Sequence, residues 1–314
     1  MPSAARGWER ERGDYVERRR TEDLSKRHVQ EIARVLSEAN RLLDEAGLSC
    51  YPRSFGPEQL NHLLTGPWKL RGPDGAGLAQ RSRQYNVCLL NGFLKAYDNL
   101  TVEKARLRFP RAPVRRLDYL KTDERRRLLD TAGRMGILPH LIVAVEMLMG
   151  LRRCEVLRLT VRDLYDDELF VRGKGKLGGK TRLVPYHDEV RRILPEFLRN
   201  RAQEIAGHSG QDLGFLFAHK RADGTLRVWS KAWVDRRVMV PAFQGAGVKK
   251  PDNLNHALRR TFGRSLWDER VPIEKIAYLM GHEDTRTTIR YLGLDQEDAR
   301  SAMAVLNRAF PAGG

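Results

Sequence analysis

The chain has 314 residues and a formal net charge of +17, with a sequence pI of about 10.1. That length predicts two domains, each able to bury a core. The basic excess points to a polyanionic partner such as a nucleic acid, rather than to a merely soluble basic enzyme. Three widely spaced cysteines argue against a disulfide framework and a cysteine-based zinc site. The longest apolar run, residues 137–151, is too short and too interrupted to span a membrane.

The first twenty residues are rich in arginine, nearly free of apolar side chains and unlike a signal peptide. They predict a basic N-terminal arm, residues 1–20, which is either a solvated tail or a polar helix that adds phosphate contacts. The solvated tail is the simpler interpretation, because few apolar residues are available for packing.

Residues 21–109 predict a small helical domain. Apolar residues recur at helical spacing over residues 28–46, and Gly47 stands where a helix commonly ends. Residues 57–64 predict a second helix that starts at a proline, and residues 80–97 predict a third. The third helix carries basic side chains that form either a DNA-binding surface or an ordinary solvated face: Arg81, Arg83 and Lys95.

Residues 110–120 predict a basic linker between the two domains. Pro110 and Pro113 disfavour a continuous helix in this stretch. Such a linker would let two domains close around a DNA duplex, and the alternative is an ordinary surface loop. Three arginines here are candidate DNA contacts: Arg111, Arg115 and Arg116.

Residues 121–314 predict a second domain of helices and short strands. It starts with a helix capped by Thr122, and the apolar run at 137–151 follows as a buried helix. The remaining elements are expected in the order of an amphipathic helix at 151–164, strands at 169–172, 181–185 and 214–217, and helices from about 230 to the end. The lysine-rich and glycine-rich segment GKGKLGGK is typical of a long basic turn between the first two strands.

Two motifs of this domain pair polar side chains at helical spacing. GLRRCEVLRL places Arg152 and Glu155 three residues apart, and NLNHALRRTFG does the same for His256 and Arg259. Each pair is expected to share one face of a helix. Taken alone, either pair is more often a surface contact than a site.

Two further motifs supply a mobile cation and a phenol. GKGKLGGK flanks Lys174 with glycines, so that it can reach forward, although a basic turn touching phosphates non-specifically explains it equally well. LMGHEDTRTTIRYLGL ends a helix at Gly281, follows it with His282 and brings up Tyr291 nine residues later. A lone tyrosine in an amphipathic helix usually belongs to a core.

Together these side chains suit one chemical problem, which is attack on a DNA phosphodiester. The attack builds a five-coordinate phosphorus with more negative charge, and two arginine forks can neutralise that charge without a metal. A tyrosine with an ordinary pKa of about 10 needs cations and a base before it can attack. The leaving 5′-oxygen needs an acid, such as lysine or histidine.

In order and spacing, the segments GLRRCEV, GKG, HALR and LMGH, followed by Tyr291, resemble the tyrosine recombinases, the phage-integrase-type or Xer-type site-specific recombinases. The resemblance covers residues 120–309, and the N-terminal part agrees only in kind. It implies a mainly α fold with a small β-hairpin. An N-terminal helical core-binding (SAM-like) domain would precede an α+β catalytic domain.

The resemblance also implies roles for the phenol and for the groups that bind the phosphate. Tyr291 would be the nucleophile and form a 3′-phosphotyrosyl link, with no metal, cofactor or ATP. Arg152 and Arg259 would bind the scissile phosphate, and Glu155 would hold Arg152 in place.

Proton transfer is assigned by the same resemblance. Lys174, or alternatively Lys176 or Lys180, would protonate the leaving 5′-hydroxyl. His256 would act as a base toward the tyrosine, and His282 would hydrogen-bond the phosphate or orient the tyrosine. Basic side chains near the motifs are further candidate DNA contacts: Lys176, Lys180, Arg260 and Arg290.

Similar proteins work as tetramers on two duplexes and exchange strands through a Holliday junction. The resemblance therefore implies a homo-oligomer on double-stranded DNA and a cytoplasmic, nucleoid-associated protein. Residues 295–310 predict an amphipathic helix that docks on a neighbouring protomer or packs on its own domain. Two alternatives stay open: a DNA-binding accessory protein without catalysis, and an enzyme that resembles type IB topoisomerases.

Overall fold

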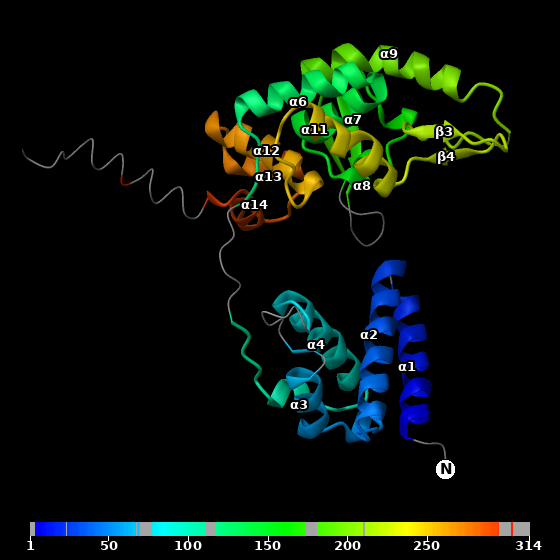
Figure 1. Cartoon of the computed structure of the whole chain (residues 1–314), viewed down its shortest axis with the longest axis vertical. Helices are drawn as coiled ribbons and strands as arrows, with labels where there is room; N and C mark the ends of the chain where they lie inside the picture. The colour runs from blue at the N-terminus through cyan, green and yellow to red at the C-terminus, as the bar shows by residue number, and fades with distance from the viewer. Residues whose placement is uncertain are drawn as a thin grey trace, which may run out of the picture. The chain divides into compact units, whose positions relative to one another are not determined.

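The computed structural model describes residues 4–22, 24–66, 68–69, 77–110, 117–173, 181–209, 211–294 and 303. The chain divides into two compact units, residues 1–114 and 115–314. Both are mainly helical in their described parts, and the second adds two small antiparallel sheets (Figure 1). The predicted fold class, mainly α with a small β-hairpin, is confirmed.

The first unit is a bundle of helices around one hydrophobic core. Its described helices are α1 (Ala4–Thr21), α2 (Lys26–Glu45), the 3-10 helix η1 (Pro52–Ser54), α3 (Pro57–Thr65), α4 (Gln80–Lys95) and α5 (Thr101–Lys104). The three helices predicted here are confirmed with small shifts at their ends. Ser25, for example, caps α2 by accepting a hydrogen bond from the His28 amide at 3.2 Å, so this helix starts before the apolar pattern does.

The N-terminal segment packs into this unit, so the solvated tail expected for residues 1–20 is wrong for its described part. Trp8 is fully buried in α1, its ring meets Phe93 edge-on at 5.1 Å, and its indole N–H donates to the Leu36 carbonyl at 3.2 Å. Tyr15 stands seven residues after Trp8, which places both rings on one helix face. Two aromatic rings bury as much surface as several aliphatic side chains, which is why a count of apolar residues missed the contact.

The second unit is built around α7 (Ile137–Leu148), whose residues from Leu141 to Ala144 are fully buried. α7 packs against α6 (Thr122–Met135), α9 (Asp188–Glu204) and α12 (Leu254–Asp268) (Figure 1). The other described elements are α8 (Arg153–Val156), η2 (Val161–Asp163), β1 (Glu168–Arg172), β2 (Thr181–Pro185), β3 (Ala218–Lys220), β4 (Leu226–Val228), α10 (Lys231–Val234), the π-helical turn η4 (Asp235–Met239), α11 (Val240–Gly245), α13 (Ile273–Met280) and α14 (Thr285–Leu292).

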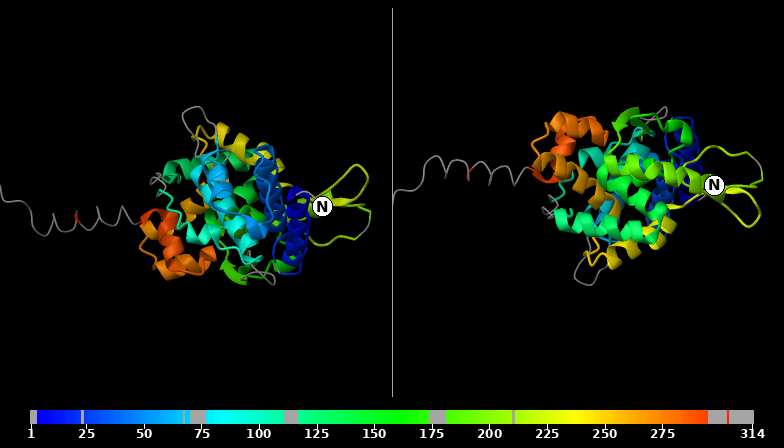
Figure 2. Two further views of the ribbon diagram at one scale, coloured as in Figure 1. Left: turned by 90° about the horizontal axis from the view of Figure 1, so that it is seen from below. Right: turned by 90° about the horizontal axis from the view of Figure 1, so that it is seen from above.

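The strands form two separate hairpins. β1 pairs with β2 in the predicted antiparallel arrangement, with Phe170 opposite Leu183. β3 pairs with β4, and this hairpin projects from the helices of its unit (Figure 2). The strand expected at 214–217 is wrong: Phe215 makes only an isolated bridge to Thr160, and pairing begins at Ala218. Gly214 has a positive φ of 72°, which turns the chain just where the strand was expected to begin.

Three other expectations need correction or fall outside the description. The amphipathic helix expected at 151–164 shrinks to α8 and the short η2. α6 begins at Thr122 itself, because the Glu124 carboxylate accepts from the Lys121 amide at 2.8 Å and caps the helix one residue earlier. The C-terminal helix expected at 295–310 lies outside the described residues, apart from residue 303.

Candidate active site

The first functional arginine sits on a sharp turn after the central helix α7. Gly150 has a φ of +67°, and a Cβ there would lie 2.3 Å from the Phe262 ring, so only glycine fits. Arg152 follows with extended backbone at the start of α8, and Glu155 folds back to it. The carboxylate accepts from the Arg152 amide at 2.9 Å and from its guanidinium at 2.7 Å. The pair therefore meets at a helix start, and not on the shared helix face that the sequence predicts.

Glu155 is the anchor of a cluster of arginines. Besides Arg152, its carboxylate accepts from Arg182 at 3.0 Å and lies 3.8 Å from the Arg259 guanidinium. Burial acts to raise the pKa of Glu155, but the Arg182 hydrogen bond and the positive charges around it hold that pKa below its ordinary value. Glu155 is therefore ionised at neutral pH, and one negative charge faces three positive ones.

Sequence reasoning missed Arg182. It is buried on β2, and its Nε donates to the Leu279 carbonyl in the last turn of α13 at 2.8 Å. Arg182 and Val184 are the inward positions of this strand. A charged residue on the inward side of a two-residue alternation was the available signal, because such a residue is buried only with a partner.

Arg259 is held by two backbone carbonyls inside the second unit. It projects from α12 and is only 1 % exposed. Its guanidinium donates to the carbonyl of Gly150, in the turn after α7, and to the carbonyl of Met280, the last residue of α13. Burial, together with repulsion from Arg152, lowers the pKa of Arg259 to about 9. The guanidinium is still charged at neutral pH, in surroundings that favour an added anion.

The second histidine and the tyrosine come from the two helices that follow. α13 ends at Gly281, where φ is +61° and a Cβ would lie 2.7 Å from the Arg182 guanidinium. His282 comes next, and its ring meets the Tyr291 ring edge-on at 5.4 Å. Burial and the nearby arginines lower the pKa of His282 to about 3, so its imidazole is neutral at physiological pH.

The Tyr291 phenol faces the first histidine. Its oxygen lies 3.0 Å from His256 Nδ1 and 3.2 Å from the His256 carbonyl. Burial raises the pKa of Tyr291, although Arg259 and Arg260 act in the opposite direction. His256 is exposed and is placed by Asn253, which caps α12 by accepting from the His256 amide at 3.3 Å.

The structure thus brings together Arg152, Glu155, His256, Arg259, His282 and Tyr291, whose side chains form one continuous cluster in the second unit. The predicted Lys174 lies outside the described residues, as do Lys176, Lys180, Arg111, Arg115 and Arg116.

The other predicted DNA contacts occupy varied environments. The Arg260 guanidinium lies 6.0 Å from the Tyr291 ring, and Arg290 is exposed. In the first unit Arg81 is exposed on α4, whereas Arg83 lies over the Phe109 ring. Lys95 is held by Glu103 at 2.7 Å.

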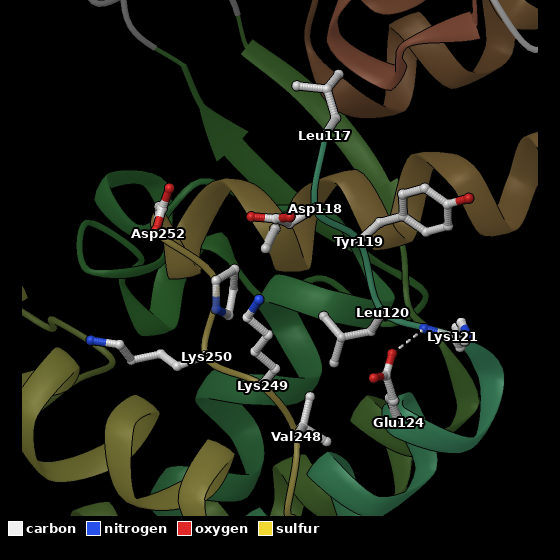
Figure 3. Close-up of a pocket in the computed structure, with 12 residues that line it drawn as sticks. Leu117, Asp118, Tyr119, Leu120, Lys121, Glu124, Val248, Lys249, Lys250 and Asp252 are labelled. Carbon is white, nitrogen blue, oxygen red and sulfur yellow. Dashed lines mark hydrogen bonds between the residues drawn. The ribbon is translucent and has the colours of Figure 1, made fainter. Parts of the chain in front are cut away.

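A pocket of about 360 Å³ lies beside the start of α12, lined by residues 117–121, Glu124, 248–252 and Ala257 (Figure 3). Its wall contains as many acidic side chains as lysines: Asp118, Glu124 and Asp252 against Lys121, Lys249 and Lys250. The arginine cluster does not line it. The balance of charge gives this pocket no preference for an anion.

Across the described ranges, we find no group of three or more histidine, cysteine or acidic side chains placed to hold a metal ion. None of the helices in the described part of the chain has the length and apolarity needed to cross a membrane.

Comparison with known sequences identifies the class. The pattern of a family described as the phage integrase family matches residues 118–298. The tyrosine recombinase XerA of Pyrococcus furiosus is 26% identical over 234 residues, which cover 72% of this chain and 77% of the relative. XerC of Xanthomonas axonopodis pv. citri is 31% identical over 193 residues, or 61% of this chain and 59% of the relative.

Solved structures agree on the fold. The XerH site-specific recombinase in a post-cleavage complex with its palindromic difH substrate matches with a TM-score of 0.67 and 17% identity, over 89% of this chain and 80% of that one. The Tn1549 transposon integrase bound to transposon right end DNA also has a TM-score of 0.67, with 16% identity over 96% of this chain and 99% of that one. The fold is therefore that of the tyrosine recombinases. The chain belongs to the phage integrase family, as the motifs predict, and is a recombinase enzyme.

Proposed function

We propose that this recombinase cleaves and rejoins DNA at specific sites through a 3′-phosphotyrosyl intermediate on Tyr291, without metal or ATP. The observation that carries the proposal is the phenol held 3.0 Å from an imidazole nitrogen, beside a cluster whose arginines outnumber its single carboxylate. A phosphodiester is an anion of suitable charge for that cluster.

Arg152 and Arg259 would bind the scissile phosphate. Both are held by hydrogen bonds to the protein, so little reorganisation is needed when charge builds on the five-coordinate phosphorus. Glu155 keeps Arg152 in place, and the buried Arg182 does the same for Glu155. Removal of one preorganised donor of this kind commonly lowers a rate by about 10²–10³-fold.

The proton balance follows from the contacts of the phenol. Because burial keeps the pKa of Tyr291 above its ordinary value, the phenol is protonated at neutral pH and needs a base. We assign that role to His256, which accepts the proton as the Tyr291 oxygen bonds to phosphorus. The bond from phosphorus to the 5′-oxygen breaks, and Lys174, or alternatively Lys176 or Lys180, delivers a proton to that oxygen. The reverse sequence rejoins the strand: the 5′-oxygen attacks phosphorus and the tyrosyl ester breaks. No ATP is needed because each step exchanges one phosphate ester for another.

On DNA we propose a helical DNA-gripping domain that includes α1 and extends to residue 109, a linker at 110–120 and a catalytic domain at 121–314. Four protomers would act on two duplexes through a Holliday junction, with the C-terminal helix docked on a neighbour. The DNA complexes of XerH and of the Tn1549 integrase support a DNA partner. Such a protein would lie in the cytoplasm at the nucleoid.

The test is covalent trapping on nicked suicide duplexes, with sequences selected by their binding to the full chain. The wild type should form a DNA adduct in EDTA, and Tyr291→Phe should bind the same duplexes without forming one. An adduct that persists in the phenylalanine variant refutes the assignment of the nucleophile. Specific binding with no adduct would indicate an accessory protein, and relaxation of a supercoiled plasmid without a site would indicate an enzyme of the topoisomerase IB type.

A further inference from the structure

One buried hydroxyl contacts the candidate active site and has been given no role so far, although it lies within the segment LMGHEDTRTTIRYLGL. Thr288 lies in α14, one turn before Tyr291, and its side chain is fully buried. Its Oγ1 lies 2.8 Å from His282 Nδ1, at the distance of a strong hydrogen bond. The contact joins His282, which follows the Gly281 cap of α13, to α14, the helix that carries Tyr291.

Because the His282 ring is neutral, its contact with Thr288 determines which ring nitrogen carries the proton. Since burial and the nearby arginines lower the pKa of His282 to about 3, the ring holds one proton at neutral pH. In a neutral imidazole one nitrogen donates and the other accepts, and the partner of one nitrogen fixes the role of the other. The hydrogen bond at Nδ1 therefore determines what Nε2 can offer.

The hydroxyl of Thr288 can serve as the donor in this bond. Two other hydroxyls of the unit donate to carbonyls four residues back: the buried Thr261 to Ala257 at 2.8 Å and the half-buried Ser265 to Thr261 at 2.6 Å. Among the described residues, the hydrogen bond found for the Thr288 hydroxyl goes to His282. Its proton is therefore available for Nδ1.

The chemistry of the site favours the same direction. The Met280 carbonyl accepts a hydrogen bond from Arg259, and Gly281 lies against the Arg182 guanidinium, so His282, the next residue, stands beside the proposed phosphate site. Phosphate oxygens only accept hydrogen bonds, so a neutral imidazole is useful there only if Nε2 carries the proton. A lone pair on Nε2 would instead repel them.

We propose that Thr288 is a positioning residue: its hydroxyl donates to His282 Nδ1 and holds the imidazole in the tautomer that carries its proton on Nε2. The donor is then fixed in place before the phosphate arrives. This inference rests on the proposed function of the arginine cluster as a phosphate site.

The first measurement needs no DNA. Nitrogen-15 spectra of the full chain labelled at histidine distinguish protonated from unprotonated ring nitrogens, and the signals that vanish in His282→Asn identify the residue. We expect Nε2 protonated and Nδ1 unprotonated in the wild type and in Thr288→Ser, which keeps the hydroxyl. In Thr288→Val, which has nearly the same shape, the Nδ1 signal should move because its donor is gone. A protonated Nδ1 in the wild type, or an unmoved signal in the valine variant, overturns the proposal.

The second measurement is the rate of adduct formation on the suicide duplex. Loss of one neutral hydrogen bond predicts a rate about three- to tenfold lower for Thr288→Val and close to wild type for Thr288→Ser. In a His282→Asn background the valine change should have no further effect, because Thr288 acts through the ring. A wild-type rate in the valine variant, or the same loss in both backgrounds, contradicts a positioning role.

These results separate two kinds of failure. If the wild type forms no adduct at all, the proposed function fails, while the spectra still decide the direction of the hydrogen bond. If the valine variant does not fold, as judged by circular dichroism, Thr288→Ala replaces it in both measurements.

Discussion

Replacement of Arg182 by methionine tests whether a residue outside the recognised motifs holds the active site together. Arg182 donates to Glu155 at 3.0 Å and to the Leu279 carbonyl at 2.8 Å, and its side chain is 4% exposed. Breaking a buried ion pair usually costs about 3–5 kcal/mol, because the remaining charge stays buried. Here Glu155 keeps two hydrogen bonds from Arg152, and repulsion among the arginines is relieved. We therefore expect a loss of about 2–3 kcal/mol in the free energy of unfolding, near the value for one charged hydrogen bond.

Urea unfolding of the full chain, followed by circular dichroism, measures this loss as a shift of about 1 M in the midpoint. The matched control is Arg191→Met, which removes an exposed arginine paired with Asp167 at 2.8 Å. Exposed pairs contribute little, so the midpoint of the control should stay close to that of the wild type. Equal midpoints for Arg182→Met and the wild type would refute the argument that this arginine stabilises the cluster.

The effect of pH on the same variant checks its cause. The pKa of Glu155 is lowered in the folded protein, so its ionised form stabilises the fold above its unfolded pKa of about 4.3. Arg182 stabilises only the ionised form, so what it adds in the wild type is lost as the pH falls through the folded pKa of Glu155. The difference in stability between the two proteins should therefore be full at pH 7 and should narrow below about pH 4. A difference that stays constant over this range would mean that packing, and not charge, is lost.

Three further changes probe other parts of the molecule. Gly150→Ala should destabilise the second unit by about 2–3 kcal/mol in urea unfolding, because φ is +67° and the methyl group would overlap the Phe262 ring. Trp8→Ala should cost about 3–5 kcal/mol by the same assay, since a fully buried indole is removed; a negligible cost would mean that α1 does not pack. His256→Gln should lower the rate of adduct formation about 10²–10⁴-fold while leaving the affinity for DNA unchanged, as measured by fluorescence anisotropy.

The pairing of two site residues could be predicted from sequence where both lie on one continuous helix in the structure. His256 and Arg259 lie on one continuous helix, so three positions along the chain become one turn in space. Arg152 and Glu155 were paired correctly but for another reason, since the helix that should contain both begins only after Arg152. The pairing survives because a carboxylate three residues into a helix reaches back to the residue before it.

What could not be predicted depends on contacts between distant segments. Arg182 lies on a strand and meets Glu155, which is 27 residues earlier, and Leu279, which is 97 residues later. The alternation along β2 could have marked Arg182 as inward-facing, but no local pattern names its two partners. Thr288 follows His282 by only six residues, but its hydroxyl resembles that of any helical threonine until the ring beside it is seen. Burial of Trp8 likewise requires α2 and α4 to be in place.

The charged arginines lie inside the cluster, and the histidine proposed as the base lies at its exposed edge. Inside it, Arg152, Arg182 and Arg259 surround one carboxylate. Burial, together with these arginines, lowers the pKa of His282 to about 3, so this ring is neutral at physiological pH. At the rim, His256 is exposed and touches the phenol directly. Burial and the same arginines would lower the pKa of a base inside the cluster, as they do for His282. The proposed transfer of the Tyr291 proton therefore favours a histidine at the exposed edge of the cluster, which is the position that Asn253 and the first turn of α12 give to His256.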